Sequence, residues 1–147
     1  MGELIRLSKS CLSDAEKKAV MDVLDSEFLG MGVEVNKFER LLSSFFSREA
    51  VCVSTGTAAL HLALQAIGVG AGDEVLVPSL TYVASFQAIS AVGAKPIACE
   101  VDSQTLCLGI TDLEKKITIR TKAIMPVHFA GGVGALSDLY QLAKDNK

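Results

Sequence analysis

A short polar stretch, Ser54-Thr55-Gly56-Thr57, lies between the apolar run "AVCVS" and a pattern rich in alanine and leucine. The pattern predicts a helix that begins at about Thr57 and ends near Ile67, and the apolar run predicts a strand before it. A helix N-terminus has free N–H groups and a partial positive charge, so it attracts anions. Gly56 would let the backbone approach a phosphate, Thr57 would add a hydroxyl, and the amides of Thr57 and Ala58 would face outward.

The same residues also fit an ordinary helix cap that binds no ligand, because Ser and Thr are common N-cap residues and Gly eases tight turns. Two well-known phosphate motifs are excluded. No GK[ST] sequence follows the junction, so this is not a P-loop. The "GVGAG" stretch at 68–72 follows a helix, and "GGVGAL" at 131–136 has the wrong glycine spacing for a dinucleotide fingerprint. The residues alone leave a phosphate cradle and an ordinary cap both open.

A second polar stretch, "VPSLTYVAS", follows the next predicted strand and places Tyr82 at the start of the next helix. In a parallel sheet, Tyr82 would lie at the same edge as Thr57, where ligands bind. A phosphate cradle beside a ring that stacks on a flat ligand is typical of a pyridoxal phosphate pocket, although Tyr82 alone also fits a packing role. His128, after the fourth strand, and His61, in the apolar face of the Thr57 helix, are interpreted as structural, with His61 satisfied inside the packing.

Strands and helices alternate after an N-terminal helical stretch. Ser13 and Glu16 form a capping box before one helix, and a second helix is expected from about Glu34 to Phe46. The later strands are nearly all apolar, which is typical of parallel strands buried on both faces. The sequence therefore predicts an α/β fold of three layers, with a mostly parallel sheet and helices on both faces. The expected strands are 50–54, 74–79, 95–101 and 122–129, and the later helices are 82–93, 112–116 and 136–147.

Composition excludes several functions. The 147 residues have a net charge of −3 and no Lys/Arg cluster longer than two residues, which argues against nucleic-acid binding. No apolar run reaches the ~18 residues of a membrane span, and no secretory signal precedes the first helix, so a cytoplasmic protein is expected. The four cysteines form no CxxC pair, and no metal site is expected. Half of the residues are hydrophobic, which suggests an uncovered core surface or a surface for a partner.

Three stretches together resemble a known family. They are "STGTAALHLALQAIGVGAGDEVLVPSLTYVAS", "VGAKPIACEVD" and "TKAIMPVHFAGG", and they resemble the DegT/StrS-type nucleotide-sugar aminotransferases. These enzymes use pyridoxal 5′-phosphate and have the aspartate-aminotransferase fold. The resemblance implies that Gly56, Thr57 and Ala58 contact the cofactor phosphate and that Tyr82 stacks on its pyridine ring. His128 matches a recurrent "PVH" of the family, but no chemical role follows from the match.

The resemblance stops before the family's catalytic residues. The acidic "EDAAH"-like motif, the Schiff-base lysine and the small C-terminal domain would all lie beyond Lys147, so no catalytic residue is assigned. Residues 1–48 would be an N-terminal helical segment and residues 49–147 the first part of the large domain that binds pyridoxal phosphate.

The resemblance implies a parent protein that acts in polysaccharide biosynthesis as a homodimer and transfers an amino group from glutamate to a nucleotide-linked keto sugar. The chain alone is expected to be inactive. Some relatives replace the lysine and act as sugar dehydratases, which remains an alternative. A non-catalytic nucleotide-binding or interaction remnant is another.

Overall fold

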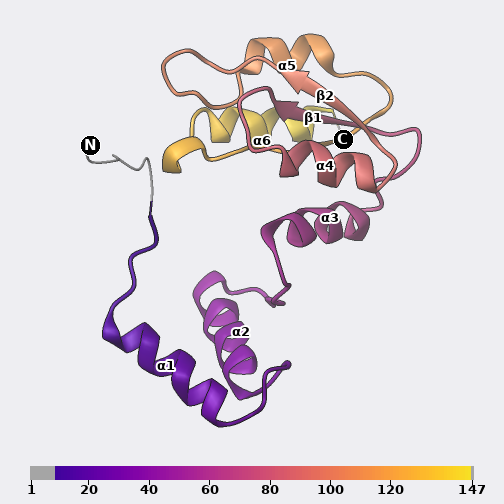
Figure 1. The fold of residues 1–147 in the computed structure, drawn as a ribbon. Coiled ribbons are helices and arrows are strands. Elements are labelled where there is room, and N and C mark those ends of the chain that lie inside the picture. The colour runs from indigo at the N-terminus through magenta and orange to yellow at the C-terminus, as the bar shows by residue number, and fades with distance from the viewer. Residues whose placement is uncertain (1–8, 147) are drawn as a thin grey trace, which may run out of the picture. The chain divides into compact units, whose positions relative to one another are not determined.

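The computed structural model describes residues 9–146. The chain divides into two compact units, Met1–Cys52 and Val53–Lys147. Figure 1 shows the elements of both units along the chain. Within the described residues, no helix is both long enough and apolar enough to cross a membrane.

The first unit contains two helices, as the sequence predicts. Helix α1 (Asp14–Asp25) begins with the expected capping box: Ser13 N–H donates to Glu16 Oε2 at 2.6 Å, and Ser13 Oγ accepts from the Ala15 amide at 3.2 Å. Helix α2 (Val33–Phe46) ends at Ser47, which has a left-handed conformation. Neither helix contains a fully buried residue, and most of their apolar side chains are exposed, although Val23, Val35 and Leu42 are partly buried.

The expected strand at residues 50–54 does not form, and this prediction is wrong. No strand pairing involves this run in the described part of the chain. Two of its amides are instead bound by side chains of α2: Ala50 N–H donates to Ser43 Oγ at 3.0 Å, and Cys52 N–H donates to Glu39 Oε1 at 2.8 Å. A strand is stabilised by ladder partners and not by its own sequence, so β propensity alone did not produce one here.

The second unit is built on a parallel sheet in the order β2-β1-β3. The central strand β1 (Glu74–Pro78) is buried along its whole length, whereas β2 (Lys95–Cys99) and β3 (Thr121–Ile124) are partly exposed. Burial on both faces is thus confirmed for β1 only. The outer strands are shorter than the sequence predicts, because β2 ends at Cys99 where its partner β1 ends, and β3 pairs with β1 only as far as Ile124.

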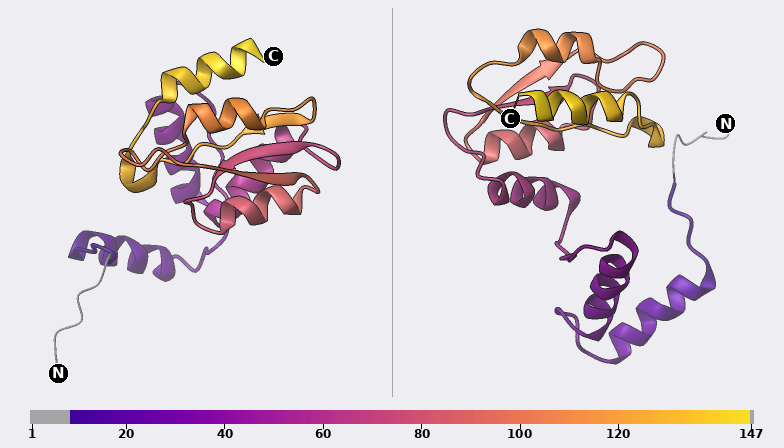
Figure 2. Two further views of the ribbon diagram at one scale, coloured as in Figure 1. Left: turned by 90° about the horizontal axis from the view of Figure 1, so that it is seen from above. Right: turned by 180° about the vertical axis from the view of Figure 1, so that it is seen from behind.

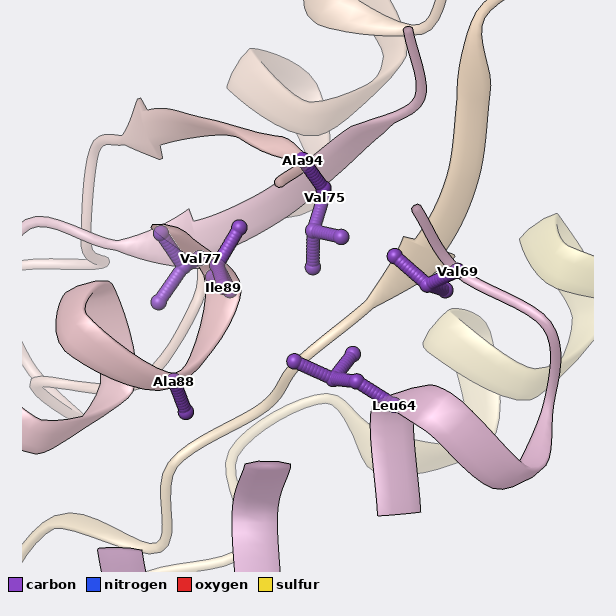
Figure 3. Close-up of a cluster of buried hydrophobic side chains, with 7 residues drawn as sticks. All are labelled: Leu64, Val69, Val75, Val77, Ala88, Ile89 and Ala94. Carbon is purple, nitrogen blue, oxygen red and sulfur yellow. The ribbon is translucent and has the colours of Figure 1, made fainter. Parts of the chain in front are cut away.

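Helices cover both faces of this sheet, as Figure 2 shows, which confirms the three-layer α/β prediction. Helices α3 (Gly56–Ala66) and α4 (Ala84–Ala91) cover one face; α5 (Ile110–Lys116) and α6 (Leu136–Asp145) cover the other. Alternation along β1 divides the core, because successive strand residues point to opposite faces. The α3/α4 cluster in Figure 3 contains Leu64, Val69, Val75, Val77, Ala88, Ile89 and Ala94. The α5/α6 cluster contains Leu76, Cys99, Leu108, Leu113 and Leu139.

A buried carboxylate closes the amino end of β1. Glu74 is 3% exposed and accepts hydrogen bonds from Arg120 Nη2 at 2.7 Å, Arg120 Nε at 3.0 Å and Thr118 Oγ1 at 2.6 Å. Its hydrogen bonds from Thr118 and then from Arg120 lower the pKa of Glu74 below its ordinary value. These contacts join the start of β1 to the turn before β3.

Candidate functional site

The start of α3 is fixed by Thr55. This N-cap residue is extended (φ −152°, ψ 156°), and its Oγ1 accepts from the Ala58 amide at 3.0 Å. Its carbonyl accepts from the Ala59 amide at 3.1 Å. The helix therefore begins at Gly56, and the hydroxyl that caps it belongs to Thr55. The capping interpretation of the "STGT" junction is confirmed.

Capping leaves two donors free at the same point. Among the residues that the structure describes, neither the Gly56 amide nor the Thr57 amide makes a hydrogen bond. The Thr57 side chain is exposed, and a Cβ built on Gly56 would meet no atom within 4 Å, so open space faces this turn. Two N–H groups, a hydroxyl and a positive helix end fit a phosphate. The Ala58 amide, which was expected to be free, already has a partner in Thr55.

Tyr82 lies in the loop between β1 and α4. It was expected to open the helix, but α4 begins at Ala84 with Val83 as its N-cap, so that prediction is wrong. The loop instead makes a turn in which Ser85 N–H donates to the Tyr82 carbonyl at 3.1 Å. The Tyr82 side chain is 79% exposed. It is therefore available to a ligand and contributes little to the described core.

The two parts of the candidate site lie at one edge of the sheet. Helix α3 leads into β1, and α4 leads from β1 into β2, so each helix runs opposite to the parallel strands. Both helices therefore begin at the edge where β1 ends, and Figure 1 shows their starts on that side. This is the edge at which parallel α/β sheets bind ligands. The structure thus brings Gly56, Thr57 and Tyr82 to the same edge.

The two histidines differ from each other. His128 follows β3 and precedes the short 3-10 helix η1 (Phe129–Gly131), and its Nδ1 lies 3.0 Å from the Gly132 carbonyl. This contact ties the ring to its own loop, which agrees with a structural role. His61 Nε2 is buried and has no hydrogen-bond partner in the described part of the chain. The expectation that His61 would be satisfied is therefore wrong.

Sequence reasoning missed a partly buried hydroxyl pair beside Tyr82. Thr81 Oγ1 and Ser85 Oγ lie 2.9 Å apart, and Ser85 is 5% exposed. The spacing of four residues in "TYVAS" was the available signal, but it identifies a contact only if both residues face the core.

Cys99 also lies near this edge. Burial raises the pKa of its thiol, so it is not activated as a nucleophile.

Comparison with known proteins identifies the family. Residues 10–147 match the profile of the DegT/DnrJ/EryC1/StrS aminotransferase family. The chain belongs to this family. It is 44% identical over 135 residues to the GDP-perosamine synthase of Escherichia coli O157:H7. The matched region covers 90% of the chain and 37% of that protein. The resemblance carried by the three sequence stretches is confirmed.

Solved structures of relatives support the same conclusion. Spr1654 from Streptococcus pneumoniae, known in PLP, PMP and apo forms, is 38% identical with a TM-score of 0.86 over 93% of the chain and 35% of its own. 3-Amino-5-hydroxybenzoic acid synthase is 37% identical with a TM-score of 0.85, over 92% of the chain and 36% of its own. The chain thus spans little more than a third of the length of these relatives.

Proposed function

We propose that the protein containing this chain is a pyridoxal 5′-phosphate-dependent aminotransferase that transfers an amino group from glutamate to a nucleotide-linked keto sugar. Membership of an aminotransferase family supports the reaction class. One structural observation carries the cofactor assignment: the free amides of Gly56 and Thr57 lie at the start of α3, at the same sheet edge as the β1–α4 loop that carries the exposed Tyr82. We also propose that residues 49–147 form the first part of the cofactor-binding domain of a homodimeric enzyme.

In this proposal, the first turn of α3 holds the cofactor phosphate. The Gly56 and Thr57 N–H groups and the Thr57 hydroxyl donate to its oxygens, and the helix end adds about 0.3–1 kcal/mol of favourable interaction with the negative charge. Ala58 keeps its amide on Thr55 and contributes by fixing the geometry of the turn.

The Tyr82 ring lies against the pyridine ring in the same proposal, and such a contact contributes about 0.5–1.5 kcal/mol beyond burial. When bound, pyridoxal phosphate supplies an electron sink for the carbon that carries the amino group. None of the residues assigned here moves a proton. Their work is to bind and orient the cofactor, and we propose that the chain alone does not catalyse amino transfer.

The test of the cofactor site uses pyridoxamine 5′-phosphate, whose amine does not react with surface lysines. Its binding to the 147-residue chain is followed by the fluorescence anisotropy of the ligand. Pyridoxamine without phosphate should bind at least about tenfold more weakly, because a hydrogen bond to a charged group contributes about 1.5–3 kcal/mol. Equal affinity for the two ligands would overturn the phosphate assignment.

A matched pair of variants locates the site. Thr57 is the second residue of α3, and Thr111 is the second residue of α5, which begins on the other face of the sheet. Thr57→Val should weaken binding of pyridoxamine phosphate about tenfold through the lost hydroxyl donor, whereas Thr111→Val should leave it unchanged. If the two variants bind alike, the phosphate does not lie at α3.

A separate assay tests the proposal of inactivity. The chain is incubated with pyridoxal phosphate, glutamate and a nucleotide-linked keto sugar, and 2-oxoglutarate is measured. No turnover is expected. Formation of 2-oxoglutarate above the level of a protein-free control would show that the chain contains a complete catalytic set.

A further inference from the structure

The backbone of its turn fixes the position of Tyr82 and the direction of its Cα–Cβ bond. The side chain is 79% exposed and has no hydrogen bond within the described residues. The start of its loop is anchored where Ser79 N–H donates to the Cys99 carbonyl at 2.8 Å. Beyond that anchor, the conformation of the Thr81–Tyr82 turn depends on contacts with α4.

One residue of α4, Ser85, makes a hydrogen bond to each residue of the Thr81–Tyr82 turn. Ser85 N–H donates to the Tyr82 carbonyl at 3.1 Å, and Ser85 Oγ lies 2.9 Å from Thr81 Oγ1. Ser85 is thus hydrogen-bonded to Tyr82 through its backbone N–H and to Thr81, the residue before Tyr82, through its side chain. No other side chain in the described part of the chain bonds to residues 80–82.

The Ser85 hydroxyl needs an explanation, because it is buried on an otherwise apolar face of α4. The buried neighbours on this helix are Ala84, Ala88 and Ile89. Alanine at position 85 would differ only by the hydroxyl, and a buried hydroxyl is unfavourable unless it is paired. Helix capping does not explain the pair either, since α4 has no side-chain cap. What the hydroxyl adds is its bond to Thr81.

We propose that Ser85 is a positioning residue for Tyr82. By holding both residues of the turn, it keeps the Tyr82 ring directed toward the edge where Gly56 and Thr57 present their free amides. The proposal rests on the proposed cofactor site, because the ring must be held only if a ligand uses it. Ser85 itself does not contact the cofactor and acts through Thr81 and the Tyr82 backbone.

The first experiment measures the mobility of Tyr82 without any ligand. The chain has no tryptophan and two tyrosines, Tyr82 and Tyr140, so a Tyr140→Phe chain reports Tyr82 alone. Ser85→Ala should lower the anisotropy of Tyr82 fluorescence. The control is Ser90→Ala, which removes an exposed serine from the same helix and should have no effect. Unchanged anisotropy in Ser85→Ala would overturn the proposal.

Substitutions at Thr81 provide a second route, in case Ser85→Ala does not fold. Thr81→Val removes the hydroxyl partner and should also lower the anisotropy, whereas Thr81→Ser keeps the hydroxyl and should preserve it. Loss of anisotropy in Thr81→Ser equal to that in Thr81→Val would show that the hydrogen bond is not responsible.

A double-mutant cycle with pyridoxamine phosphate distinguishes positioning from a general structural role. Ser85→Ala should weaken binding about two- to tenfold when Tyr82 is present, as expected from the loss of one neutral hydrogen bond. In a Tyr82→Ala chain it should have no further effect. An equal loss in both backgrounds would show that Ser85 supports the fold in general. If Tyr82→Ala alone leaves the affinity unchanged, the ring assignment of the proposed function is wrong, and the anisotropy measurement still decides whether Ser85 holds Tyr82.

Discussion

Replacement of Gly56 by proline would remove one proposed phosphate donor and leave α3 intact. Proline is favoured at the first position of a helix, where its missing N–H has no partner to lose. Gly56 is that residue in α3, and its amide has no hydrogen-bond partner among the described residues. The residue before a proline must be extended, and Thr55 already is, at φ −152° and ψ 156°. A Cβ at position 56 would meet nothing within 4 Å.

The effects of Gly56→Pro on stability and on binding should have opposite signs. A proline at a compatible position stabilises a protein by about 0.4–1 kcal/mol, because the unfolded chain loses freedom. For a unit of this size, that is a rise in melting temperature of about 2–8 °C. Loss of one hydrogen bond to a charged phosphate costs about 1.5–3 kcal/mol of binding energy. Since about 1.4 kcal/mol is tenfold, the Kd for pyridoxamine phosphate should rise roughly 10- to 150-fold.

The assay combines thermal unfolding by circular dichroism with titration of pyridoxamine phosphate. Gly56→Ala is the matched control, because it also reduces backbone freedom but keeps the N–H group, so its affinity should remain near that of the parent chain. Equal affinity in Gly56→Pro and Gly56→Ala would refute the role of this amide. A lower melting temperature in Gly56→Pro would refute the assignment of Gly56 to the first position of α3.

Two further predictions concern stability. The lowered pKa of Glu74, caused by Thr118 and Arg120, means that its contribution to stability is complete above the ordinary carboxyl pKa of about 4.3 and is lost as the pH falls through the lowered value. Urea unfolding at several pH values should therefore show a steeper acid loss in the parent chain than in Glu74→Gln; identical profiles would contradict this. Leu113→Ala should lower the free energy of unfolding by about 2–5 kcal/mol because Leu113 is fully buried, while Leu62→Ala at an exposed position should cost far less; similar losses would show that the α5/α6 cluster is not a packed core.

The elements best predicted from the sequence are those whose signals lie within a few residues. Ser13 and Glu16 specify the start of α1 through contacts inside one turn, and the observed capping box follows directly. The alternation of apolar strands with helices gives the three layers, because each apolar face must be covered. The start of α3 is also specified by nearby residues, and the sequence predicts it within one residue of Gly56.

Predictions failed where the outcome depends on a distant partner. The run at residues 50–54 has the composition of a strand, but Ser43 and Glu39 of α2 take its amides, and no local pattern reveals that choice. His61 shows the same limit. Its place on an apolar helix face was evident from spacing, whereas the lack of a partner for Nε2 depends on residues that reach it through space.

The candidate site combines both kinds of information, and its two halves differ in predictability for that reason. The proposed phosphate half is a helix start, so the "STGT" residues indicate it, but only the structure shows that Thr55 occupies the Ala58 amide and leaves those of Gly56 and Thr57 free. The ring half depends on where α4 packs, because that packing buries Ser85 and so fixes the turn that carries Tyr82. A sequence can therefore indicate which residues belong to a candidate site well before it specifies which of their atoms remain available to bind.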